Sequence, residues 1–176
     1  MADTANSGAA TQAPEELRLT RVFGAPRRLV FKAWTDPQQV ARWWGPRGFT
    51  NPVCEFDARP GGLIRIEMQA PFGTVYPMTG VVHEVVEPER LVFTARALEL
   101  ESGQPMFDVL NTVTFEDFHG VTKLTLHARL LTKDLKMTPQ VAMALSGMEQ
   151  GWSESLYRLA DEVDRALKTL GGQASE

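Results

Sequence analysis

The chain has 176 residues, of which 43% are apolar and 23% are charged, as expected for one globular domain. Its formal net charge of −4 argues against a nucleic-acid partner, because phosphate binding needs a concentrated basic surface. No stretch approaches the roughly 20 apolar residues that span a membrane. We therefore expect neither nucleic acid nor membrane among the partners of this chain.

The two ends of the chain differ in composition from its middle. Met1–Pro14 is small and polar and lacks the cationic start and apolar segment of a secretory signal, which predicts a disordered tail on a cytoplasmic protein. Residues 171–176 are expected to be frayed, which leaves residues 15–170 as a single domain. The one cysteine, Cys54, excludes an intrachain disulfide and a thiolate metal cage, and we expect it to be a small buried hydrophobe.

The first elements are a strand and two short helices. Leu17–Phe23 alternates between apolar and polar residues, which predicts a strand. A short helix follows, with Pro26 suited to its first position. Asp36 is placed to cap a second short helix, which Gly45 and Pro46 end.

A long meander of strands separated by turn signals follows. In one strand the odd-numbered residues from Val109 to Phe115 share an inward face, on which Asn111 is the polar exception. One face of the sheet is therefore predicted to be buried and the other wet. The six strands expected in this region are Val53–Ala58, Leu63–Ala70, Val75–Val86, Arg90–Ala97, Asp108–Glu116 and Val121–Leu131.

The last element is predicted to be one long helix. Thr138 caps it and Pro139 begins it, and apolar residues then recur at steps of three and four as far as Leu170. At 1.5 Å per residue such a helix is about 48 Å long and crosses the whole sheet. The fold class is therefore α+β: a curved antiparallel sheet of about seven strands, two short helices and a long C-terminal helix.

A cavity is expected between the sheet and this helix, because a curved sheet touches a helix along a line. Gly147 and Gly151 lie one turn apart in the helix, next to the adaptable Met143 and Met148. Glycine inside a helix costs about 0.5–1 kcal/mol relative to alanine, so two of them indicate that space is needed there. Close backbone packing or a kink is the alternative interpretation.

Aromatic and methionine residues that face this space would suit a flexible apolar ligand; each one alone is more typical of a plain core, and only their joint placement favours a pocket. The amide of Asn111 needs a partner, which is either the backbone, a buried water or the ligand. Tyr76 and the charged residues Arg65, Glu67 and Glu84 could also reach the cavity. The residues predicted to contact the ligand are Trp43, Trp44, Phe49, Met68, Met78, Phe93, Asn111, Met148, Gly151 and Trp152.

Five segments resemble a known family. They are Val30–Pro37, Trp43–Pro46, Pro60–Gly62, Glu87–Thr94 and Gly151–Leu156. In this order they are similar to the homologues of the C-terminal domain of the activator of the ninety-kilodalton heat-shock protein ATPase, which belong to the START-like (SRPBCC) superfamily.

The resemblance covers residues 17–167 and implies the helix-grip fold. Members of the superfamily bind lipids, hormones or polyketides, and some catalyse cyclisation or hydrolysis. The activator itself stimulates its chaperone through a second, N-terminal domain, for which this chain has no residues to spare. A role as a chaperone-ATPase activator is therefore the least favoured function.

No recognisable catalytic constellation is present. His83, His119 and His127 share no metal-ligand spacing, and neither a nucleophile elbow nor a phosphate-binding loop occurs. No metal, cofactor or catalytic residue is therefore predicted, which favours a binding protein over an enzyme.

The favoured function is binding of a small hydrophobic molecule, lipid-like or polyketide-like, between the sheet and the C-terminal helix. The alternative is a polyketide cyclase-like or hydrolase-like enzyme in which Asn111, Arg65 or Tyr76 orients the substrate in the same cavity. An exposed edge strand would also allow two copies to pair, so a homodimer is one permitted assembly.

Overall fold

The computed structural model describes residues 15–173, in eleven elements. The expected tail, residues 1–14, lies outside the described residues, as do residues 174–176. Residues 171–173, which we expected to be frayed, belong to the last helix. The elements are β1 (Glu16–Phe23), α1 (Arg27–Thr35), α2 (Pro37–Trp43), β2 (Thr50–Phe56), β3 (Leu63–Gln69), β4 (Val75–Val86), β5 (Arg90–Leu98), β6 (Pro105–Phe118), β7 (Val121–Leu130), α3 (Pro139–Ser146) and α4 (Met148–Gln173).

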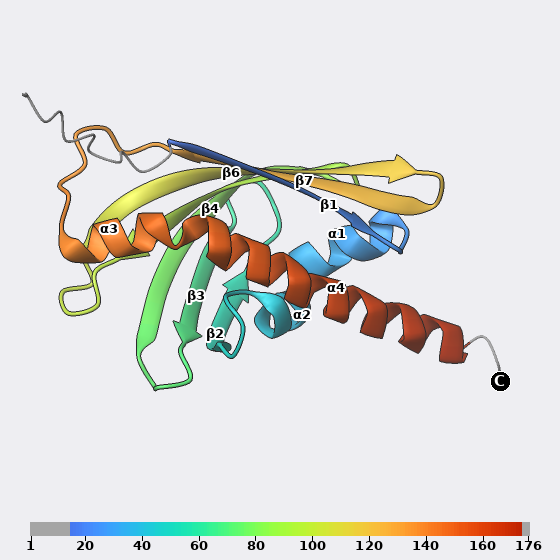
Figure 1. Cartoon of the computed structure of the whole chain (residues 1–176). Coiled ribbons are helices and arrows are strands. Elements are labelled where there is room, and N and C mark those ends of the chain that lie inside the picture. The colour runs from blue at the N-terminus through green and yellow to red at the C-terminus, as the bar shows by residue number, and fades with distance from the viewer. Residues whose placement is uncertain (1–14, 174–176) are drawn as a thin grey trace, which may run out of the picture.

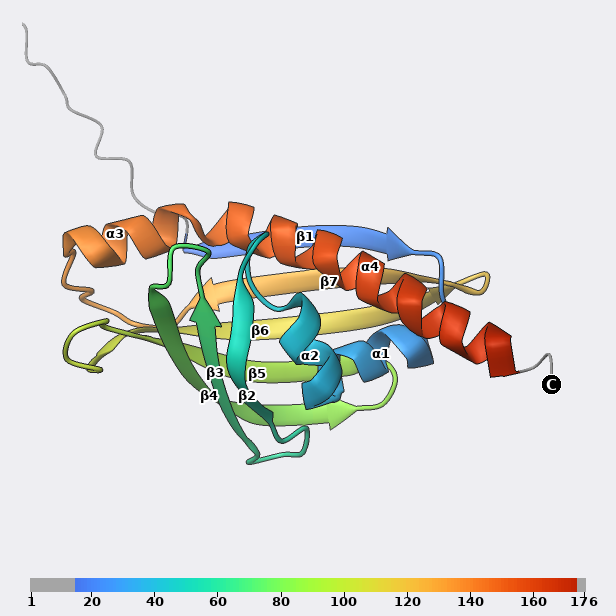
Figure 2. The same ribbon diagram turned by 90° about the horizontal axis from the view of Figure 1, so that it is seen from below.

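The seven strands form one antiparallel sheet in the order β1-β7-β6-β5-β4-β3-β2. The sheet curves, and α3 and α4 run across its hollow side, with α1 and α2 packed next to α4 at the end away from α3 (Figure 1, Figure 2). This arrangement confirms the predicted α+β fold with a curved sheet of seven strands, two short helices and a long terminal helix.

Alternation along the strands determines which residues face the helices. On β6 the odd-numbered residues from Phe107 to Phe115 are buried, and the residues between them are more exposed. Asn111 belongs to the buried set, as its position in the sequence predicted. The sheet therefore offers an apolar inner face to the helices and a polar outer face to solvent.

The expected C-terminal helix is interrupted at Gly147. α3 ends there, and Gly147 has φ −85° and ψ −5° with its N–H donating to the carbonyl of Met143 at 3.0 Å. Glycine lacks the side chain that would favour regular helix, which explains the break. The predicted cap is present, since the Thr138 hydroxyl accepts from the N–H of Val141 at 3.2 Å. No helix within residues 15–173 is long and apolar enough to cross a membrane.

The core has two parts. The larger part joins α1, α2 and the middle of α4 to the sheet, and Trp34, Trp43 and Phe93 are fully buried in it. The smaller part lies under α3, where Val141 and Leu145 pack on residues of β1, β6 and β7. The concave side is thus filled with aromatic rings at one end and only thinly covered at the other.

The only cysteine provides a test of packing in β2. Cys54 is partly buried against the larger core, and burial raises the pKa of its thiol to about 11, with a smaller contribution from the Glu55 carboxylate. Because the thiolate is the reactive form, the thiol should stay protonated and unreactive at neutral pH.

We expect Cys54 to react with Ellman's reagent at pH 8 on the order of a hundredfold more slowly in the folded chain than in urea, since its pKa lies well above the usual 9.0. The rate in the folded protein should rise as the pH approaches 11. The absorbance of the released thiolate measures this rate directly, because the chain has one cysteine. Equal rates in the folded and unfolded chains would contradict the burial of Cys54.

Candidate ligand-binding cavity

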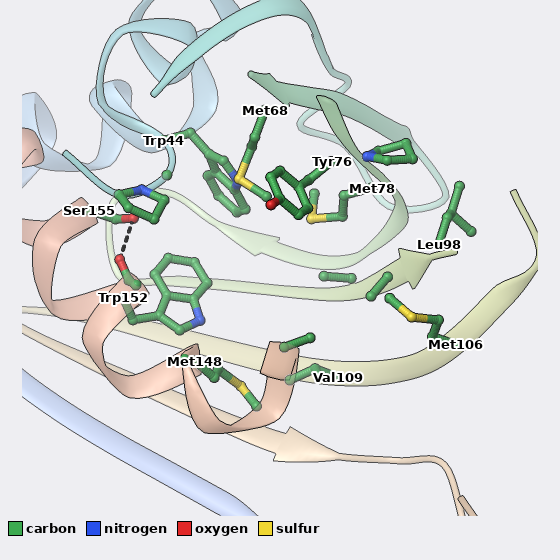
Figure 3. Close-up of a pocket in the computed structure, with 18 of the residues that line it drawn as sticks. Trp44, Met68, Tyr76, Met78, Leu98, Met106, Val109, Met148, Trp152 and Ser155 are labelled. Carbon is green, nitrogen blue, oxygen red and sulfur yellow. Dashed lines mark hydrogen bonds between the residues drawn. The ribbon is translucent and has the colours of Figure 1, made fainter. Parts of the chain in front are cut away.

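A cavity of about 440 Å³ lies between the sheet, α3 and the first turns of α4. Its 23 lining residues come from the α2–β2 loop, from β3 to β6, and from α3 and α4, and none of them is charged. Figure 3 shows Met148, Trp152 and Ser155 of α4 on one side and Met68, Tyr76 and Met78 of the sheet on the other. Met143 of α3 lines the cavity and is 59% exposed, so the cavity opens to solvent beside α3.

Most of the residues proposed as ligand contacts are brought together at this cavity. Eight of the ten line it: Trp44, Phe49, Met68, Met78, Asn111, Met148, Gly151 and Trp152. Trp43 and Phe93 do not line it, because both are fully buried in the larger core. The Trp43 indole N–H donates to the carbonyl of Ala33 at 2.8 Å, which turns that ring toward α1 and away from the cavity.

Tyr76 also lines the cavity, whereas the three charged residues considered with it do not. Arg65 pairs with Glu67 at 2.8 Å and Glu84 pairs with Arg90 at 3.3 Å, all on the exposed side of the sheet. The pairing of β4 with β5 shifts register between Val82 and Glu84. The pairing of β3 with β4 is regular, so Arg65 and Glu67 keep the outward orientation that alternation assigns to them.

Small residues that the sequence analysis did not single out complete the lining. Ala95 and Ala97 of β5 and Ala144 of α3 all contact the cavity. The signal was available in β5, since Phe93, Ala95 and Ala97 alternate along the inner face and only the first of them is large. The cavity begins where the side chains of this face become small.

An aromatic wall closes one end of the cavity. Trp44 and Trp152 meet edge to face with ring centroids 5.1 Å apart. Trp34 stacks behind Trp152 at 5.9 Å with an interplanar angle of 20°, and it also contacts Phe93 and Phe115 of the sheet. Aromatic pairs in such geometries each contribute about 0.5–1.5 kcal/mol, so ring–ring contacts stabilise this wall.

Methionines form much of the remaining lining. Five of the seven methionines of the chain contact the cavity. Their unbranched side chains have several rotatable bonds and a polarizable sulfur, so they adapt to occupants of different shape. These residues are Met68, Met78, Met106, Met143 and Met148.

The two helix glycines have different roles. A Cβ atom on Gly151 would lie 4.0 Å from Cγ of Pro46, which is ordinary contact, so the helix leaves room at this position. Gly147 ends α3 and marks the break between the two helices. Both alternatives considered for these glycines are therefore present, space at Gly151 and a kink at Gly147.

Polar groups are few in the lining. Asn111 is 1% exposed, and its Nδ2 donates to the carbonyl of Val109 at 3.2 Å. Its Oδ1 is buried and has no partner among the described residues. Ser155 donates its hydroxyl hydrogen to the carbonyl of Gly151 at 2.8 Å (Figure 3).

The three histidines lie away from the cavity. His83 bonds to Thr94 on the outer face of the sheet, and His127 contacts Glu16 at 3.3 Å. His119 lies in the turn between β6 and β7 with φ 54°. Within residues 15–173, no group of three His, Cys, Asp or Glu side chains is placed to hold a metal ion.

An arginine of α4 fixes the loop that carries one side of the cavity. Arg158 Nη1 lies within 3.0 Å of the carbonyl oxygens of Trp44, Gly45 and Pro46, and Nη2 donates to those of Arg42 and Phe49. The carbonyls of a helix end have no partners within the helix, and the planar guanidinium supplies several donors at once. Burial lowers the pKa of Arg158, but an arginine stays charged at any ordinary pH.

We expect Arg158→Met to lower the free energy of unfolding by about 2–3 kcal/mol, because hydrogen bonds from a charged donor are lost while the carbonyls stay in place. Urea denaturation followed by tryptophan fluorescence measures the change. Lys168→Met, at an exposed position of the same helix, is the matched control and should change stability by less than about 0.5 kcal/mol. Equal losses in the two variants would show that the guanidinium does not hold the loop.

Comparison with known proteins agrees with this architecture. Residues 24–164 match the family described as "Activator of Hsp90 ATPase homolog 1-like protein". The chain belongs to this family. No protein of curated function matches the sequence significantly.

Solved structures show the same fold in this family. A protein from Chromobacterium violaceum is 30% identical, with a TM-score of 0.68 over 85% of this chain and 97% of its own. The AHSA1 protein from Silicibacter pomeroyi is 27% identical, with a TM-score of 0.72 over 86% of this chain and 99% of its own. A protein from Arthrobacter aurescens is 25% identical with a TM-score of 0.72, over 86% and 87% of the two chains. The chain is thus similar to these proteins over nearly their whole length.

Proposed function

We propose that this member of the family binds a small, neutral, apolar molecule in the cavity between the sheet and the helices α3 and α4. The observation that carries the proposal is a space of about 440 Å³ whose 23 lining residues are all uncharged. Ligand pockets of proteins occupy roughly 300–1,000 Å³ and are mostly apolar with a few placed polar groups. The cavity has this size and this character.

The volume also sets the size of the occupant. One water molecule, which has a single non-hydrogen atom, takes up ~30 Å³ of the liquid, so the cavity has room for on the order of 15 such atoms. Each methylene that leaves water for this lining contributes about 0.8 kcal/mol. A molecule with a medium-length alkyl chain or two aromatic rings therefore suits the space, and the methionines adapt to either.

Binding is favoured over catalysis by the chemistry of the lining. None of its residues carries a carboxylate, an imidazole or a thiol, which are the usual general acids, bases and nucleophiles. The hydroxyl groups of Tyr76 and Ser155 and the amides of Gln140 and Asn111 suffice to orient a ligand. The cyclase-like alternative would have to work with these groups alone.

The fluorescent probe N-phenyl-1-naphthylamine, which is neutral and has two aromatic systems, should bind in this cavity and brighten. Ala144→Phe should weaken its binding at least tenfold, because the new ring occupies the space beside α3. Fluorescence titration measures the dissociation constant. At about a hundred times that constant, the probe should raise the free energy of unfolding of the unaltered chain by about 2.7 kcal/mol.

The matched control is Ala142→Phe, which introduces the same ring into α3 at an exposed position that does not line the cavity. This variant should bind the probe as the unaltered chain does. If the two variants bind the probe equally well, the probe is not in the cavity. If the unaltered chain neither binds the probe nor gains stability from it, the proposed function is wrong.

A further inference from the structure

We propose that the ligand is an uncharged molecule that carries a hydrogen-bond donor, a hydroxyl or an amide N–H, at its buried end, and that Oδ1 of Asn111 accepts this hydrogen bond. The inference rests on the proposed function. It adds which polar group the ligand carries and which end of the ligand lies deepest in the cavity.

Asn111 is at the inner end of the cavity. The lining stops at Ala95 on β5 and at Asn111 on β6, and the next inward-facing residues, Phe93 and Val113, are fully buried in the larger core. The opposite end opens beside Met143. A polar group at Asn111 is therefore reached only by the part of a ligand that enters farthest.

The hydrogen bonds of the Asn111 side-chain amide determine which ligand groups it can bind. Nδ2 is identified by its contact with the carbonyl of Val109 at 3.2 Å, because a carbonyl can only accept. Oδ1 is then an acceptor without a donor among the described residues, in a side chain that is 1% exposed. Buried acceptors are nearly always paired, and an unpaired one is unfavourable. A donor on the ligand removes this penalty.

The other groups that line the cavity also favour an uncharged ligand with a hydrogen-bond donor. Ser155 uses its hydroxyl hydrogen on the carbonyl of Gly151, so its oxygen can only accept a further hydrogen bond (Figure 3). No cation lines the cavity, and an ionised carboxylate placed there would lose its hydration without a counter-charge. The inner end therefore favours an alcohol, a phenol or an amide over a fatty acid anion.

Two isomers that differ only in the donor test this proposal. 1-Dodecanol and methyl undecyl ether have the same formula, and each can be titrated against bound N-phenyl-1-naphthylamine. We expect the alcohol to bind about tenfold more tightly than the ether, which corresponds to 1.4 kcal/mol, and more tightly than dodecanoate. If alcohol and ether bind equally to the unaltered chain, the proposal is overturned, although binding in the cavity stands.

Asn111→Leu removes the acceptor at similar volume. The advantage of the alcohol over the ether should disappear in this variant, while the ether still binds. Thr112→Val, on the same strand but facing the other side of the sheet, is the control and should keep the advantage. If Asn111→Leu still prefers the alcohol, another group recognises the hydroxyl and the role proposed for Asn111 is wrong. If Asn111→Leu does not fold, the comparison of the two isomers on the unaltered chain is the deciding test.

Discussion

The architecture depends on Trp34 as a spacer between the sheet and α4. Its indole touches Phe93 and Phe115 of the sheet on one side and stacks on Trp152 of α4 on the other. Trp152 lies near the beginning of α4, so this part of the helix meets β5 and β6 through an indole rather than directly. The ring therefore holds the first turns of α4 away from these two strands, and the space that remains beside it is the cavity.

Arg158 also determines the shape of the cavity, because it positions the loop that forms one of its sides. It joins α4 to the end of α2 and to the loop that follows, through backbone carbonyls rather than through a carboxylate. Such a contact depends on the path of the loop and not on the side chains that the loop carries. Trp44 and Phe49 are thus held at the cavity by an interaction that does not involve their own rings.

The fold could be predicted from the sequence because it follows from repeating patterns. Alternation located the strands, and Asp36 and Thr138 marked two helix starts that the structure confirms. One continuous helix was expected, with a kink at the glycines as the alternative, because the apolar spacing of three and four residues continues through Gly147. Periodicity describes which side of a helix is buried and is insensitive to a single residue with altered dihedral angles.

The cavity was harder to predict in detail, because its limits depend on rings that come from different elements. Trp43 and Trp44 are adjacent, and only the path of the chain after α2 shows that the first faces the core and the second the cavity. Phe93 pairs with Asn111 across two strands, yet only Asn111 lines the space, because Trp34 and Trp44 cover the phenyl ring. Packing between segments that are distant in the sequence determines which ring faces the cavity, so a local sequence pattern cannot predict it.

The concentration of methionine around the cavity has a consequence for how the protein responds to oxidants. Oxidation turns a thioether into a sulfoxide, which is polar and chiral, and reductases reverse the reaction. Met143 is exposed at the opening, so it meets a dissolved peroxide before the methionines deeper in the lining do. A single oxygen atom there would place a strong acceptor at the entrance of an otherwise apolar space, and the chemical history of a sample would then alter what the cavity admits.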